Sequence, residues 1–103
     1  MDFQEISRKA ITVRKLYEEF EARQYGAPWT SEEIALGFVG DVGDLEKLVM
    51  AESGRWTILE SKIKLAHELA DCLWSALVLA NLHNIDLEKT FLETMNNLER
   101  QLS

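Results

Sequence analysis

The sequence predicts an all-α protein, a four-helix, bundle-like subunit that forms one domain over residues 1–103. Apolar residues recur at steps of three and four along four separate segments, which is the spacing of one face of a helix. No run alternates apolar and polar residues as a half-buried strand would. A chain of 103 residues is also the length of one small domain, without a repeat or a linker to divide it.

The first helix is predicted over residues 3–23. It then stops at "QYGAPWT", where Gly26 and the only proline, Pro28, break the helical pattern. Its expected apolar stripe consists of Ile6, Ala10, Val13, Leu16, Tyr17 and Phe20.

The second helix is predicted from about Ser31 to about Glu52. Thr30 followed by Glu33 forms a capping box, in which a hydroxyl and a carboxylate bond free amides at a helix start. Gly54 is the expected cap at its far end. The stretch "GFVGDVGDLEKL" within this helix carries three glycines, each of which costs about 1 kcal/mol relative to alanine.

The third helix is predicted over residues 60–83 and the fourth over residues 86–102, with Asp86 as the cap of the fourth. From Leu69 onward, "LADCLWSALVLANL" is apolar nearly all the way round, so this helix should be buried on several sides. The run is shorter than the roughly 20 apolar residues that span a bilayer. We therefore expect a central helix in a bundle that is completed by a second copy, as a homodimer or homotetramer.

Charge and cysteine content exclude several classes of protein. The formal net charge of −7 disfavours binding to a nucleic acid polymer, which depends on clustered lysine and arginine. The lone Cys72 excludes an internal disulfide, and no charged segment followed by an apolar one opens the chain. We expect a cytoplasmic protein with no membrane partner.

Two helices each place a pair of acids beside an apolar face. Asp41 falls within the apolar arc of the second helix, and Asp44 lies at its edge, three residues later. In the third helix Glu68 and Asp71 belong to a polar ladder that begins at Lys64. Most acid pairs on helices are solvated or paired with lysine, but two pairs that both face inward favour a shared site.

Four acids held close together repel one another and raise their own pKa values unless a divalent metal neutralises them. Carboxylate oxygens without histidine or cysteine suit Mg²⁺, with Mn²⁺ as a second possibility. A calcium EF-hand starting at Asp41 is excluded, because Gly43 and Leu45 would occupy ligand positions. We therefore predict that Asp41, Asp44, Glu68 and Asp71 bind magnesium.

Two further residues are candidates for contacting a substrate. Trp29 lies in the loop before the second helix, where an aromatic ring can stack on a base, although it can equally pack as a lid. Lys64 lies one turn before Glu68 and can reach a phosphate, although a salt bridge to that same glutamate is the simpler interpretation.

The stretches "VGDVGDLEKL" and "HELADCLWSALVLANLHNIDLEKTF" resemble the MazG-like, all-α nucleotide pyrophosphohydrolases, which include dimeric dUTPases and dCTP pyrophosphatases. The resemblance runs from about Trp29 to Phe91. It implies that the four acids bind magnesium and that Glu68 and Asp71 act in catalysis. It also implies hydrolysis of a nucleoside triphosphate to the monophosphate and pyrophosphate, as a house-cleaning or nucleotide-pool activity.

The last predicted helix departs from many members of this family. They carry a lysine and, four residues on, an asparagine that help to hold the phosphates, and this chain has Thr94 and Leu98 at those positions. An alternative function therefore stays open. The chain could be a catalytically weak or inactive MazG-like module that binds a nucleotide or a metal, or that serves an interaction.

Overall fold

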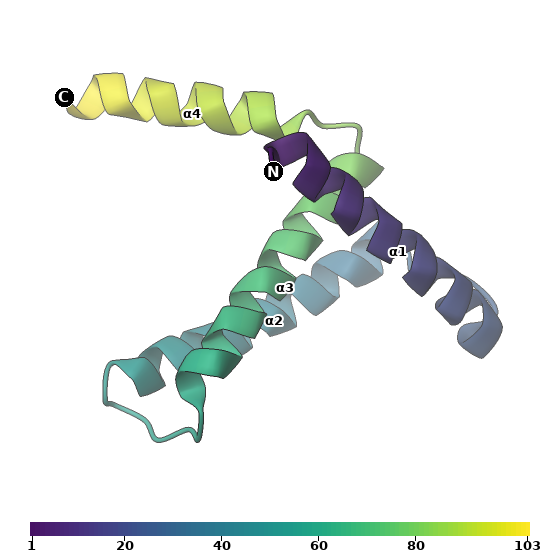
Figure 1. Ribbon diagram of the computed structural model, residues 1–103, viewed down its shortest axis with the longest axis horizontal. Helices are drawn as coiled ribbons and strands as arrows, with labels where there is room; N and C mark the ends of the chain where they lie inside the picture. Colours follow the sequence, from purple (N-terminus) through teal and green to yellow (C-terminus); the bar gives the residue numbers. More distant parts are fainter.

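The computed structural model describes residues 1–103 and contains four α-helices and no strand (Figure 1). The predicted all-α class is confirmed, and each helix boundary lies within two residues of its predicted position. The helices are α1 (Phe3–Tyr25), α2 (Ser31–Glu52), α3 (Ser61–Leu82) and α4 (Leu87–Leu102).

Local sequence signals fix where the helices begin and end. The predicted capping box is present, because the Glu33 amide donates to Thr30 Oγ1 at 3.2 Å and the Thr30 amide donates to Glu33 Oε1 at 2.9 Å. Gly26 and Gly54 follow α1 and α2 with φ of 87° and 82°, a left-handed conformation that glycine adopts without strain. The Asp86 side chain caps the first turn of α4, as predicted.

Helices α2 and α3 lie along each other, α1 crosses α3, and α4 extends away from the other three (Figure 1). Trp74 joins α3 to α1, because its indole Nε1 donates to the Ala10 carbonyl at 3.1 Å and its ring meets that of Tyr17 edge to face at 5.7 Å. The small apolar core consists of Ala10, Ile34, Leu48, Leu77, Val78 and Ala80. None of the four helices has the length and apolar content that a membrane span requires.

The buried face of α1 differs from the prediction. Leu16 and Phe20 of the expected apolar stripe are 61% and 45% exposed, whereas Arg14 and Glu21 are buried with Ala10. Arg14 and Glu21 are seven residues apart, which places both on one side of the helix after two turns. Because the two side chains form an ion pair, with 3.1 Å between Arg14 Nη1 and Glu21 Oε1, they can turn inward together and leave apolar neighbours outside.

A single copy of the chain is more open than a compact protein of its size. Its accessible surface is 7905 Å², whereas the usual scaling for a mass of 11.8 kDa gives about 5,900 Å². Its radius of gyration is 16.3 Å, against about 13 Å for a compact domain of this length. Helix α4 has no buried residue, and Leu69 and Leu73 of α3 are about half exposed. The four helices therefore do not close into a compact bundle within the one chain.

Candidate metal centre

Three of the four predicted acids meet between α2 and α3. One carboxylate oxygen from each of Asp41, Asp44 and Glu68 lies within 4.8 Å of the other two. The spacing of three residues puts Asp41 and Asp44 on one side of α2, and the packing of α3 along α2 brings Glu68 opposite them. Oxygens that share one magnesium ion at 2.0–2.1 Å lie roughly 3 to 4 Å apart, so small side-chain movements would suffice to bind it.

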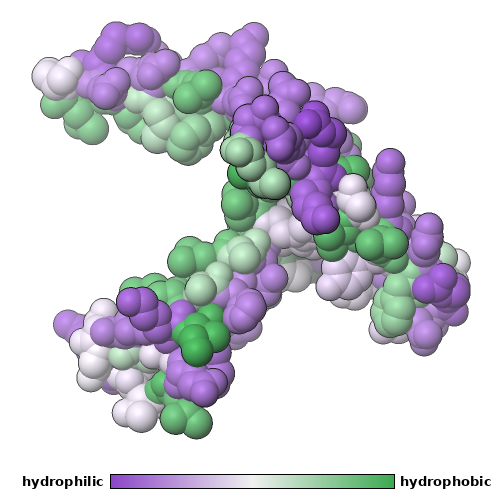
Figure 2. All heavy atoms as spheres, in the orientation of Figure 1, coloured by the Kyte–Doolittle hydropathy of each residue, from purple (hydrophilic) through white to green (hydrophobic).

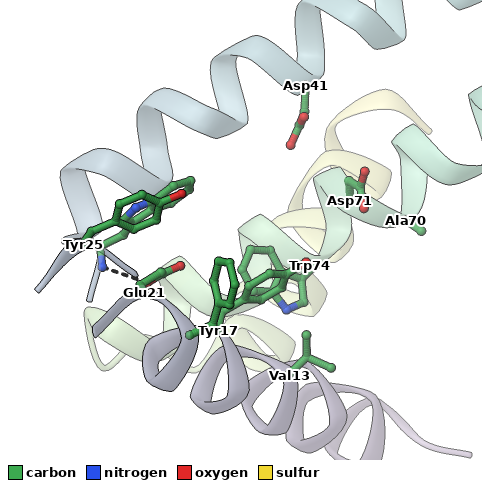
Figure 3. Close-up of a pocket in the computed structure, with 10 residues that line it drawn as sticks. Val13, Tyr17, Glu21, Tyr25, Asp41, Ala70, Asp71 and Trp74 are labelled. Carbon is green, nitrogen blue, oxygen red and sulfur yellow. Dashed lines mark hydrogen bonds between the residues drawn. The ribbon is translucent and has the colours of Figure 1, made fainter. Parts of the chain in front are cut away.

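Asp71 lies beside this group rather than within it. It lines the same cavity as Asp41, and Figure 3 shows the two carboxylates facing a common space from α2 and α3. Its negative charge also acts on the cluster, because it raises the pKa values of both Asp41 and Glu68. The structure thus brings all four predicted acids into one region, with Asp71 at its edge.

The cluster carries negative charge that no protein group neutralises. Burial raises the pKa of Glu68, and the charges of Asp41, Asp71 and Asp44 raise it further. Glu68 Oε2 is buried and has no hydrogen-bond partner. The ion pairs of the chain are those that Arg14 makes on α1, so no lysine or arginine reaches these acids. A buried carboxylate oxygen without a donor, among other carboxylates, fits a hard divalent cation such as Mg²⁺ or Mn²⁺.

A cavity of about 590 Å³ opens next to the acids and is largely aromatic. Asp41 and Asp71 form the part of its wall that adjoins the cluster (Figure 3). Its volume is in the range of pockets that hold a small ligand. The aromatic part of the wall comes from α1, the following loop and α3, and consists of Tyr17, Phe20, Tyr25, Trp29 and Trp74.

The family model for the MazG nucleotide pyrophosphohydrolase domain matches residues 29–101. This match covers α2, α3 and nearly all of α4, and it includes the four acids. The chain belongs to the MazG family. Comparisons with curated proteins and with solved structures return no match. Helix α1 lies outside the matched residues, so much of the aromatic wall lies outside the part of the chain that defines the MazG domain.

The two predicted substrate residues of the MazG domain differ in their placement. Trp29 lines the cavity and is 45% exposed. Lys64 is exposed, does not line the cavity and forms no ion pair with Glu68. The simpler interpretation of Lys64 as a salt-bridge partner is therefore wrong, and its contact with a phosphate stays a prediction.

The contribution of α1 to this site does not follow from the sequence pattern. Tyr17 and Phe20, which the spacing places on an apolar stripe, line the cavity. Glu21, for which the sequence predicts no role, is the third carboxylate of the cavity wall. A signal is present in the sequence, since Arg14 and Glu21, seven residues apart, both lie at the edge of the apolar side of α1, next to Ala10.

Cys72 neighbours the acids but is unsuited to act as a nucleophile. Burial raises the pKa of its thiol, and the negative charges of Asp41, Glu68 and Asp71 raise it further. The thiol is therefore protonated at neutral pH, whereas the reactive and metal-binding form is the thiolate.

The raised pKa values predict how the metal-free protein responds to pH. Between the ordinary carboxyl pKa of about 4 and the raised values of Asp41 and Glu68, the folded protein binds more protons than the unfolded chain. The free energy of unfolding contributed by the cluster should thus fall as pH rises through this range. Magnesium should oppose this loss. At a concentration a hundredfold above its Kd, it should raise the free energy of unfolding by about 2.7 kcal/mol.

Thermal unfolding in EDTA and in magnesium, at pH 5 and pH 7.5, checks this expectation. The rise in Tm caused by magnesium should be larger at pH 7.5, because protons compete with the metal at the lower pH. An equal rise at both values would show that magnesium does not act through these carboxylates.

Proposed function

We propose that this protein is a magnesium-dependent nucleoside triphosphate pyrophosphohydrolase, which converts a ribo- or deoxyribonucleoside triphosphate and water to the monophosphate and pyrophosphate. The observation that carries the proposal is the unpartnered Glu68 oxygen among the acids of α2 and α3, next to an aromatic cavity. Membership in the MazG family supports the same reaction.

The proposed site consists of two neighbouring surfaces, the acidic cluster and the aromatic cavity. Asp41, Asp44, Glu68 and Asp71 would hold magnesium, and the aromatic cavity would hold the base, with Trp29 stacked against it. Bound magnesium neutralises phosphate charge and lowers the pKa of a water. Because Asp41 and Asp71 belong to both surfaces, a base in the cavity places its phosphates beside the acids.

Glu68 and Asp71 are the residues that we assign to the attacking water. Both come from α3 and lie one turn apart, so they can accept hydrogen bonds from one water while Asp41 and Asp44 hold the cation from α2. A role in nucleotide-pool control would be exercised in the cytoplasm.

Incubation of the chain with the eight common nucleoside triphosphates and magnesium tests this function. We expect pyrophosphate and nucleoside monophosphate in equal amounts from at least one substrate, and no product when EDTA replaces magnesium. Release of inorganic phosphate instead would contradict cleavage between the α and β phosphates.

The same measurement distinguishes the alternative function. Magnesium binding without turnover of any triphosphate would favour a non-catalytic binding module. The last helix allows this outcome, since the Thr94 hydroxyl donates to the Thr90 carbonyl of its own helix and Leu98 is apolar.

A further inference from the structure

A buried ion pair on α1 adjoins the aromatic cavity and lies outside the residues of the family match. Arg14 and Glu21 are each 4% exposed. They also hold the main chain of Trp29, because Arg14 Nη2 donates to its carbonyl oxygen at 2.6 Å and its amide donates to Glu21 Oε1 at 2.8 Å. Buried charges are costly unless they are paired and hydrogen-bonded, and both groups are paired here and bonded to the Trp29 main chain, with Arg14 Nε alone left without a hydrogen bond. It fixes Trp29 and the Glu21 carboxylate relative to each other.

The two oxygens of Glu21 are used unequally. Oε1 accepts from Arg14 and from the Trp29 amide, whereas Oε2 has only Arg14 Nη1, at 3.5 Å. That distance is at the weak limit of a hydrogen bond, so Oε2 keeps acceptor capacity. Glu21 lines the cavity, and Figure 3 shows its carboxylate directed into the space that the aromatic rings enclose. No lysine or arginine is part of the cavity wall to occupy this oxygen.

We propose that Glu21 is a specificity residue, which selects bases with an amino group rather than a carbonyl at C4 of a pyrimidine or C6 of a purine. This inference rests on the proposed function, in which the cavity holds the base. An amino group donates to the free Oε2 atom, whereas a carbonyl oxygen would set two acceptors against each other. Cytosine is then preferred over uracil, and adenine over hypoxanthine.

The size of the preference follows from the charge of the acceptor and its burial. A base that cannot donate loses a hydrogen bond to a charged group. Its affinity should therefore be about tenfold to a hundredfold lower than that of a base that can donate. A site built to bond a polar group discriminates strongly against a ligand that lacks it, since the buried group is left unpaired. Arg14 acts as a positioning residue, because it holds the carboxylate in place and does not itself line the cavity.

The test is Glu21→Gln in the full chain, with rates of pyrophosphate release compared within the pairs CTP and UTP, and ATP and ITP. Arg14 and the Trp29 amide are both donors, so the glutamine oxygen should take the place of Oε1 and its amide nitrogen should face the cavity. The cavity then presents a donor instead of an acceptor. We expect the ratio of kcat/KM within each pair to shift at least tenfold towards the carbonyl-bearing base.

Glu18→Gln is the matched control. Glu18 lies on the same helix with an oxygen 3.7 Å from Arg14 Nε, but it does not line the cavity. This variant should keep the ratio of the parent protein. A purely structural ion pair would lower the rates for both members of a pair together and leave their ratio unchanged, which would overturn the proposal.

Binding of CMP and UMP, followed by tryptophan fluorescence, separates this inference from the proposed function. Trp29 and Trp74 both line the cavity and should report its occupancy. The parent protein could bind CMP in preference to UMP and yet hydrolyse no triphosphate. This result would support the selection of bases by Glu21 and refute the proposed enzymatic function. Equal binding of CMP and UMP by the parent, or binding of neither, would overturn the inference whether or not the variant folds.

Discussion

Glu68→Gln should lower the rate of pyrophosphate release by about a hundredfold or more and abolish the rise in Tm that magnesium causes. Glu68 is the only acid that α3 contributes to the three-residue cluster, and its Oε2 atom is buried without a donor. The amide keeps the shape of the side chain but removes the charge that would bind the metal. Assays of pyrophosphate release and of thermal unfolding, each with and without magnesium, measure both effects.

The metal-free variant should be at least as stable as the parent. Glutamine removes the repulsion that raises the pKa of Glu68 beside Asp41, Asp71 and Asp44. A lower Tm in EDTA would indicate that Glu68 supports the fold rather than the metal. Glu46→Gln is the control, because Glu46 is an exposed acid of α2 outside the cluster, and this variant should keep both activity and the magnesium response.

Met95→Glu combined with Leu98→Glu should convert a homodimer, or a larger assembly, into a monomer. We infer such an assembly from the roughly 2,000 Å² by which the accessible surface of one copy exceeds that of a compact monomer. This excess is counted for one copy, so a dimer could bury about 4,000 Å² in total, which is within the range of obligate homodimers. Helix α4 offers a suitable surface, because five of its large apolar side chains are exposed, and these are Phe91, Leu92, Met95, Leu98 and Leu102.

Figure 2 shows these apolar side chains as a band along α4 that faces the hollow beside the rest of the molecule. A second copy is the occupant that we expect, since α3 also exposes large apolar side chains, among them Ile63, Leu69 and Leu73. Two charges buried in such an interface would lose their hydration, which is costly for an unpaired carboxylate.

Light scattering at micromolar concentration measures the change in mass. The control variant is Asn96→Glu with Asn97→Glu, which adds the same charge to the opposite, exposed side of α4 and should leave the assembly intact. A parent protein that is already a stable monomer would refute the inference. Leu98, which stands where many members of the family carry an asparagine that helps to hold the phosphates, then has a structural role in the assembly.

The sequence by itself determined the features of this protein that depend on neighbours in the chain. The capping box of Thr30 and Glu33, the left-handed glycines and the helical periodicity act over three or four residues, so they set the four helices within two residues. The acid pairs were visible for the same reason, because residues three apart share one side of a helix.

Only the tertiary structure decided which sides of the helices meet. Whether Glu68 approaches Asp41 depends on how α3 packs along α2, and no local spacing encodes that distance. Arg14 and Glu21 can be buried because each charged group has hydrogen-bond partners. The main chain of Trp29, in the loop after α1, forms a hydrogen bond with each of them. The cavity likewise exists because α1 and α3 cross, which brings together residues as far apart in the chain as Ala10 and Trp74. Such contacts are energetically decisive yet non-local, so their partners could not be identified from the order of residues alone.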